Sequence, residues 1–190
     1  MRKYGWRELF ASSCGELKHA RTVTVCALMG AAAIVLGSLS IYVTDTIRIG
    51  FSGIPNQIVH YLFGPVTGSL FAGAMDVLKY LIKPSGAFFP GFTLVTMAAG
   101  LIYGCFFYKK PITLGRVLAA HLVVALVCNV VLNPACLSVL YGKGMGALLP
   151  PRLVKNLIMW PIDSFIFYHV AKTLDGAGVF RALQRNGASA

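Results

Sequence analysis

The sequence predicts an all-α integral membrane protein with six transmembrane helices and both termini on the inner side (N-in, C-in). Hydrophobic residues make up 57% of the 190-residue chain and charged residues 12%, whereas ordinary soluble domains are about 25% charged. Six acidic residues are too few to give a soluble core its polar shell. The net charge of +11 would suggest nucleic-acid binding in a soluble chain, but the positive-inside rule accounts for it in a membrane protein.

Six apolar segments follow one another along the chain. The first is uninterrupted by charge, the second is short and ends at Gly64-Pro65, and the third and sixth carry charged residues. About 20 apolar residues are enough to cross a bilayer, and adjacent glycine and proline interrupt a helix. The expected spans are Thr22–Tyr42, Ile54–Phe63, Val66–Ile82, Phe92–Tyr108, Val117–Leu140 and Leu153–Val170.

Basic residues gather on one side of these spans. They are concentrated before the first span, in the loop at 109–116 and after the sixth span. Because loops on the inner side carry an excess of lysine and arginine, this pattern predicts the N-in, C-in arrangement. We expect a basic cytoplasmic segment at 1–21, a six-helix membrane domain at 22–174 and a cytoplasmic tail at 175–190. Residues 1–21 are too long and too charged to begin a signal peptide.

Catalytic and metal-binding motifs are missing from the sequence. It has no HExxH, GxSxG or paired-carboxylate motif, and its four histidines are far apart. Gly142-Lys143 is no phosphate-binding loop, because Leu137 stands where the first glycine would be. The five cysteines form no CxxC pair and are interpreted as small packing residues. We therefore expect no enzyme or ATPase activity, no metal and no cofactor.

An aromatic loop connects the third and fourth spans. Two prolines and two glycines in the segment Pro84-Ser-Gly-Ala-Phe-Phe-Pro-Gly-Phe-Thr93 prevent a continuous helix. Its phenylalanines, Phe88, Phe89 and Phe92, suit either anchoring at the membrane interface or stacking on a flat ligand. The loop alone does not decide between these two roles.

Three cations are expected near the outer mouth of the protein. Lys143 lies in a glycine-rich segment that can swing over a cavity, and Arg152 and Lys155 begin the helix after Pro150-Pro151. Together they suit a ligand with carboxylates, although a rim of interfacial charge has the same composition. From the residues alone, the expected ligand is an aromatic, anionic small molecule.

Other polar residues within the spans have structural interpretations. Asp76, Lys79, Tyr80 and Lys83 share one helical face. Asp76 is expected to pair internally, with Lys79 or a basic residue of another span, while the two lysines either reach the interface or face a cavity. Asp163 is likewise expected to be structural.

Several of these motifs resemble the folate-specific substrate-binding (S) component of energy-coupling factor (ECF) vitamin transporters. The likeness covers residues 22–174 and is carried by Gly86-Ala-Phe-Phe-Pro-Gly-Phe-Thr93, Gly100-Leu-Ile-Tyr-Gly104, Leu140-Tyr-Gly-Lys-Gly144 and Arg152-Leu-Val-Lys155, with Phe63-Gly-Pro-Val-x-Gly68 and Asp76 upstream. The resemblance implies a plasma-membrane subunit that captures folate outside the cell. It also implies two kinds of partner, a transmembrane coupling subunit and a pair of cytoplasmic ABC ATPases.

Folate would be a transported ligand, not a cofactor. Its pterin and benzoyl rings would meet Phe88, Phe89 and Phe92, and its glutamate would meet the three cations. Asn133 can supply the donor and acceptor that a pterin edge requires, or form a hydrogen bond between helices. The alternatives are another vitamin or flat aromatic ligand on the same fold, and a small intramembrane enzyme or regulatory subunit.

The first span carries small residues at a spacing of four, Ala27 and Ala31. Small residues at this spacing let another helix approach closely, either within the six spans or from a partner. In the S-component family, an AxxxA motif on the first helix docks the coupling subunit. The resemblance assigns this role to Ala27 and Ala31.

Overall fold

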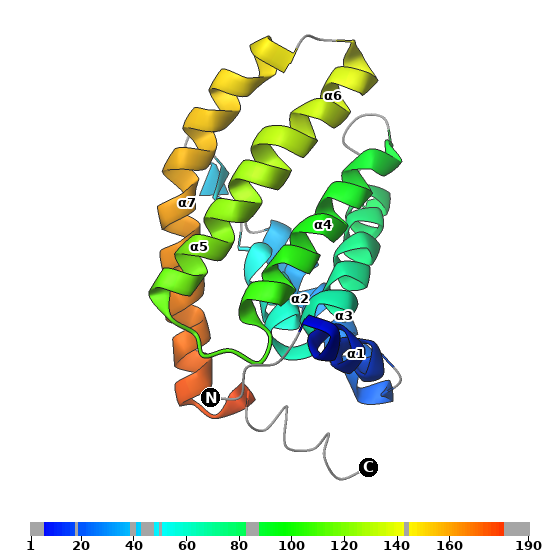
Figure 1. The fold of residues 1–190 in the computed structure, drawn as a ribbon, viewed down its shortest axis with the longest axis vertical. Helices are drawn as coiled ribbons and strands as arrows, with labels where there is room; N and C mark the ends of the chain where they lie inside the picture. The colour runs from blue at the N-terminus through cyan, green and yellow to red at the C-terminus, as the bar shows by residue number, and fades with distance from the viewer. Residues whose placement is uncertain are drawn as a thin grey trace.

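Helices dominate the structure, a computed structural model that describes residues 6–17, 19–38, 41–42, 48–49, 51–82, 88–142 and 145–180. A two-residue antiparallel pair, β1 with β2, lies between α2 and α3. Figure 1 shows α7, the continuous α5–α6 column and α4 running side by side, with α1 at the lower end of the bundle. In chain order the elements are α1 (Trp6–Glu16), α2 (Ala20–Ser38), β1 (Ile41–Tyr42), β2 (Arg48–Ile49), α3 (Gly53–Ile82), α4 (Pro90–Phe107), α5 (Leu114–Val124), the π-helix η1 (Ala125–Leu132), α6 (Asn133–Tyr141) and α7 (Met145–Gly176).

Four stretches of helix in the described part of the chain are long and apolar enough to cross a membrane. They are Ala20–Ser38, Gly53–Ile82, Pro90–Phe107 and Leu114–Leu140. The second of these joins two expected spans in one element, α3. The expected sixth span lies within the 32-residue helix α7. The outer surface is aliphatic, since Leu28, Leu94, Val139 and Leu157 are each more than 60% exposed, which suits contact with lipid better than contact with water.

The expected break in α3 is confirmed at Gly64. Its φ of 85° and ψ of −168° interrupt the helix immediately before Pro65, in a region that glycine enters without the steric cost that other residues pay. The halves of α3 on either side of the break fold against each other. A Cβ at Gly68, after the break, would collide with the ring of His60, which lies before it.

Helix α1 supplies hydrogen bonds that the break leaves unmade. The fully buried Ser13 Oγ donates to the Phe63 carbonyl oxygen at 2.7 Å and accepts from the backbone N–H groups of Val66 at 3.0 Å and Thr67 at 3.2 Å. Thr67 Oγ1 returns a hydrogen bond to the Ser13 carbonyl oxygen at 2.9 Å. The first N–H groups of a helix have no partner within that helix, so Ser13 caps the second half of α3 from another element.

Replacing Ser13 with alanine is expected to lower the free energy of unfolding by about 1–3 kcal/mol, because buried polar groups at the break lose their partner. Thermal unfolding of the detergent-solubilised protein measures this. Ser12→Ala is the matched control. Ser12 Oγ lies 3.0 Å from Tyr108 Oη and accepts from Lys109 Nζ at 2.7 Å in a more exposed setting, so its loss is expected to cost less than about 1 kcal/mol. Equal losses in the two variants would contradict the capping role.

Candidate ligand-binding site

Two neighbouring cavities lie among α3, α4, α5, η1 and α7. Both cavities are partly open to solvent. Gln57 and Asp163 line both cavities, so the two adjoin. The first is also lined by Tyr103, His121, Ala125, Asn129, Asn156, Met159 and Trp160, and the second by Phe51, Gly53, Ile54, Ile166 and Phe167.

The first cavity has polar walls contributed by separate helices. Gln57 Oε1 on α3 lies 3.1 Å from His121 Nε2 on α5, and Asn129 Nδ2 on η1 donates to Asn156 Oδ1 on α7 at 3.0 Å. Polar side chains inside a membrane bundle are costly and generally mark a binding site or a transport path. A concave site with a few convergent polar groups is the usual form of a small-molecule site.

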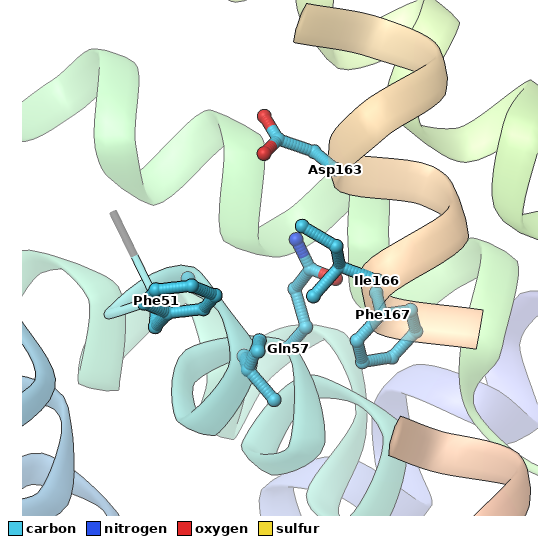
Figure 2. Close-up of a pocket in the computed structure, with 7 residues that line it drawn as sticks. Phe51, Gln57, Asp163, Ile166 and Phe167 are labelled. Carbon is cyan, nitrogen blue, oxygen red and sulfur yellow. The ribbon is translucent and has the colours of Figure 1, made fainter. Parts of the chain in front are cut away.

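Asp163 projects from α7 into the space that the two cavities share, and the Gln57 side chain reaches toward the same space from α3 (Figure 2). Within the described residues, no hydrogen bond or salt bridge is made by the Asp163 carboxylate. The expected structural role of Asp163 stays a prediction, and Lys155 on the same helix lies near enough for its charge to act on this carboxylate. A half-buried carboxylate facing a cavity gains a charge-assisted hydrogen bond when a ligand brings an N–H group.

Asp76, by contrast, has an internal partner. Thr93 Oγ1 on α4 donates to Asp76 Oδ2 at 2.8 Å. An internal partner was expected, with Lys79 named first. The charge of Lys79 does act on Asp76, and the hydrogen bond comes in addition from a hydroxyl of the neighbouring helix. The bond ties α3 to the first turn of α4, beside the aromatic loop.

The described part of the aromatic loop packs its rings on one another. The ring centroids of Phe89 and Phe92 are 5.8 Å apart, edge to face, and the half-exposed Phe88 packs on Tyr80 at 5.1 Å. Of the described residues that line either cavity, none comes from this loop. Residues 83–87 of the loop lie outside the described residues, and so does Lys143.

The cations of α7 lie one helical turn from the first cavity. The Arg152 carbonyl oxygen accepts a hydrogen bond from the Asn156 side chain at 2.9 Å, and Lys155 lies one turn before Met159. Arg152 is half-buried and Lys155 is exposed. Neither cation is among the described lining residues, nor is the half-buried Asn133 at the start of α6. The two cations are therefore near the cavity without forming its wall.

The sequence did not predict Gln57, His121, Asn156 or Asp163 as site residues. A usable signal was present in the helical periodicity. His121 and Asn129 are eight residues apart, and Asn156 and Asp163 are seven apart, within apolar helices. Such spacings place both members of each pair on one helical face.

Ala27 and Ala31 are exposed on α2, whereas Gly30 and Ala33 face the interior. A Cβ at Gly30 would lie 3.0 Å from the sulfur of Met75 on α3. The described helices therefore pack on α2 through Gly30 and Ala33 and leave its pair of alanines uncovered.

Comparison with known proteins places this architecture in a family. A family model described as "ECF transporter, substrate-specific component" matches residues 21–171. The chain belongs to this family. It is thus a membrane transport component and not an enzyme, as the resemblance in its motifs predicted.

Individual relatives agree with the family assignment. Folate transporter FolT of Clostridium novyi is 40% identical over 132 residues, which cover 70% of this chain and 77% of that protein. Folate transporter FolT of Leuconostoc mesenteroides is 32% identical over 154 residues, covering 78% and 83%. A crystal structure of FolT bound with folic acid matches with a TM-score of 0.73 and 33% identity, covering 82% of this chain and 95% of that one.

Proposed function

We propose that this protein is the folate-binding subunit of an ECF-type ABC importer, which captures folate at the outer face of the plasma membrane. The observation that carries this proposal is a polar cavity among apolar helices, in a fold that matches FolT bound with folic acid at 33% identity. Folate would be cargo, with no resident cofactor. The chain would hand it to an energising module.

The proposed topology has six spans with both termini inside. The break at Gly64 supports it, because it lets α3 supply two spans, and α7 would supply the last. The basic residues at 1–21, at 109–116 and after the sixth span would then lie in the cytoplasm.

The proposed ligand set combines the cavity with its rim. Arg152, Lys155 and Lys143 would bind the glutamate carboxylates, which is consistent with two of them lying one turn from the cavity wall. Phe88, Phe89 and Phe92 would contact the flat rings, and Asn133 would contribute a polar group. Gln57 and Asp163 would lie at the polar end of the site.

The proposed partners are a transmembrane coupling subunit and two cytoplasmic ABC ATPases. The exposure of Ala27 and Ala31 on α2 supports the first, because two small residues one turn apart allow another helix to approach.

Mass spectrometry of the ligand that co-purifies with the detergent-solubilised protein tests the function directly. The expected ligand is a folate, and calorimetry with folic acid would then give its affinity. If a flavin or another flat vitamin co-purifies instead, the assignment to the transporter family stands and the assignment of folate as the ligand is overturned.

Lys155→Ala is expected to weaken folic acid binding about tenfold to a hundredfold, the equivalent of one lost charge-assisted hydrogen bond. It should affect 6-methylpterin, which lacks the glutamate, about twofold at most. Phe89→Ala should instead weaken both compounds alike, since ring stacking does not involve the glutamate. The control is Lys172→Ala. The Lys172 ammonium donates a hydrogen bond to Tyr168 Oη at the other end of α7, so its loss should leave the affinity for both compounds unchanged. Equal losses for both compounds in Lys155→Ala would contradict a contact with the glutamate, and unchanged affinity for both would indicate that this lysine is interfacial charge.

A further inference from the structure

We infer that His121, held by Ser164, fixes the Gln57 amide with its oxygen toward the cavity. Gln57 and Asp163 then form a pair of acceptors that binds an N–H and amino edge of a heterocycle. This inference rests on the proposed function and names the ligand feature that the inner end of the site selects. It follows from the direction of three hydrogen bonds.

The Ser164 hydroxyl fixes the first direction. Its Oγ lies 2.6 Å from the Trp160 carbonyl oxygen, which can only accept, so the hydroxyl hydrogen points there. The same Oγ lies 3.0 Å from His121 Nδ1. Because Ser164 has no second hydrogen, it accepts in this contact and Nδ1 carries the proton.

The second direction follows from the burial of His121. The residue is 5% exposed, and its ring packs edge-on against Tyr103 at 5.3 Å and near Phe167 at 6.1 Å. Within the described part of the chain its hydrogen bonds are to Ser164 and Gln57, both uncharged. An ion in such surroundings is costly, so the ring is the neutral tautomer with hydrogen on Nδ1. Its Nε2 is then an acceptor.

Gln57 must therefore donate to His121. A half-turn of the amide exchanges Oε1 and Nε2 without moving any other atom, so the 3.1 Å contact becomes an N–H···N hydrogen bond. The amide oxygen then takes the position on the side of Asp163, in the space that both residues line (Figure 2). His121 is a positioning residue in this arrangement, because it acts on the ligand through Gln57.

Two acceptors that line the same cavity are satisfied by a ligand edge that carries two donors. The 2-amino group and N3–H of a 2-amino-4-oxopteridine form such an edge. A 2-oxo analogue places an acceptor where the amino group was, which leaves buried acceptors facing each other. Sites built on hydrogen bonds reject analogues of this kind strongly. The pair therefore selects 2-aminopteridines over 2-oxopteridines.

Calorimetry with folic acid and its 2-oxo analogue tests this selection. The parent protein is expected to bind folic acid at least about a hundredfold more tightly than the analogue. In Ser164→Ala, His121 is free to place its hydrogen on Nε2, and the Gln57 amide can turn its NH₂ group toward the cavity. The preference should then fall at least about tenfold, with affinity for the analogue unchanged or higher.

A control variant sharpens the result. Ser38→Ala is the matched control, because the Ser38 hydroxyl also donates to a carbonyl four residues earlier, on an exposed part of α2. This variant should prefer folic acid over the 2-oxo analogue as strongly as the parent protein does. An equal loss for both ligands in Ser164→Ala overturns the inference.

Nitrogen-15 NMR of the histidine side chains reads the tautomer without any ligand, with His121 assigned by its absence from the spectrum of His121→Gln. The expected signal is a neutral ring with hydrogen on Nδ1. A charged ring, or hydrogen on Nε2, in a protein that binds folic acid overturns the inference and leaves the proposed function intact. If the spectrum shows the expected tautomer but the protein binds neither folic acid nor its 2-oxo analogue, both the proposed function and the ligand selection are overturned.

Discussion

Replacing Ala27 and Ala31 together with tryptophan is expected to abolish folate uptake into proteoliposomes, while folic acid affinity of the isolated subunit stays within about threefold of the parent. Both alanines are exposed on α2, away from the face that packs on α3. Tryptophan at these positions would keep a partner helix from close contact and should leave the cavity untouched. Co-purification with the tagged coupling subunit and ligand titration measure the two effects separately.

Leu28→Trp is the control for this experiment. Leu28 follows Ala27 in the sequence, is already large and is 64% exposed, so a larger side chain there should leave assembly intact. Loss of folic acid binding in the double variant, with assembly retained, would mean that the alanine pair packs within the subunit.

Gly104→Val is expected to prevent accumulation of folded protein. A Cβ at Gly104 would lie 2.6 Å from the Pro65 nitrogen and 2.8 Å from the Gly64 carbonyl carbon, which are backbone atoms of the break in α3. Backbone that is fixed by a proline and by the Ser13 hydrogen bonds cannot move aside, so α4 and α3 must separate. We expect a destabilisation of about 3 kcal/mol or more, at the upper end for overpacked cores.

Size-exclusion chromatography of the solubilised protein and its thermal unfolding measure this effect. Gly115→Ala is the matched control, because a Cβ at Gly115 in α5 would meet no atom within 4 Å. That substitution should be neutral or stabilise the protein by up to about 1 kcal/mol. Normal folding of Gly104→Val would show that the two helices are not in close contact at the break.

Local signals explain what could be predicted about the fold. The break at Gly64-Pro65 is encoded in two adjacent residues, and the structure confirms it. The first and fourth expected spans agree with α2 and α4 within a few residues at each end. The β1–β2 pair and the π-helix η1 were not predicted, since neither has a distinctive local composition.

The site was harder to predict because its contacts are remote in sequence. Gln57 and His121 are 64 residues apart, and Asn129 and Asn156 are 27 apart. Sequence reasoning favoured charges and aromatic rings near loops, and so selected the rim residues Arg152 and Lys155. Sequence reasoning could not identify the uncharged Gln57 as a site residue, because its proposed role depends on which atom of His121 faces the Gln57 amide.

The hydrogen bonds between α1 and α3 also bear on biosynthesis. Ser13 precedes Phe63, the residue whose carbonyl it binds, by 50 positions, so the ribosome completes α1 well before α3. A broken helix that enters lipid with free backbone groups pays heavily for each of them. Helix α1 therefore comes earlier in the chain than the backbone groups of the break, and it supplies the hydrogen-bond partner that lipid cannot give them.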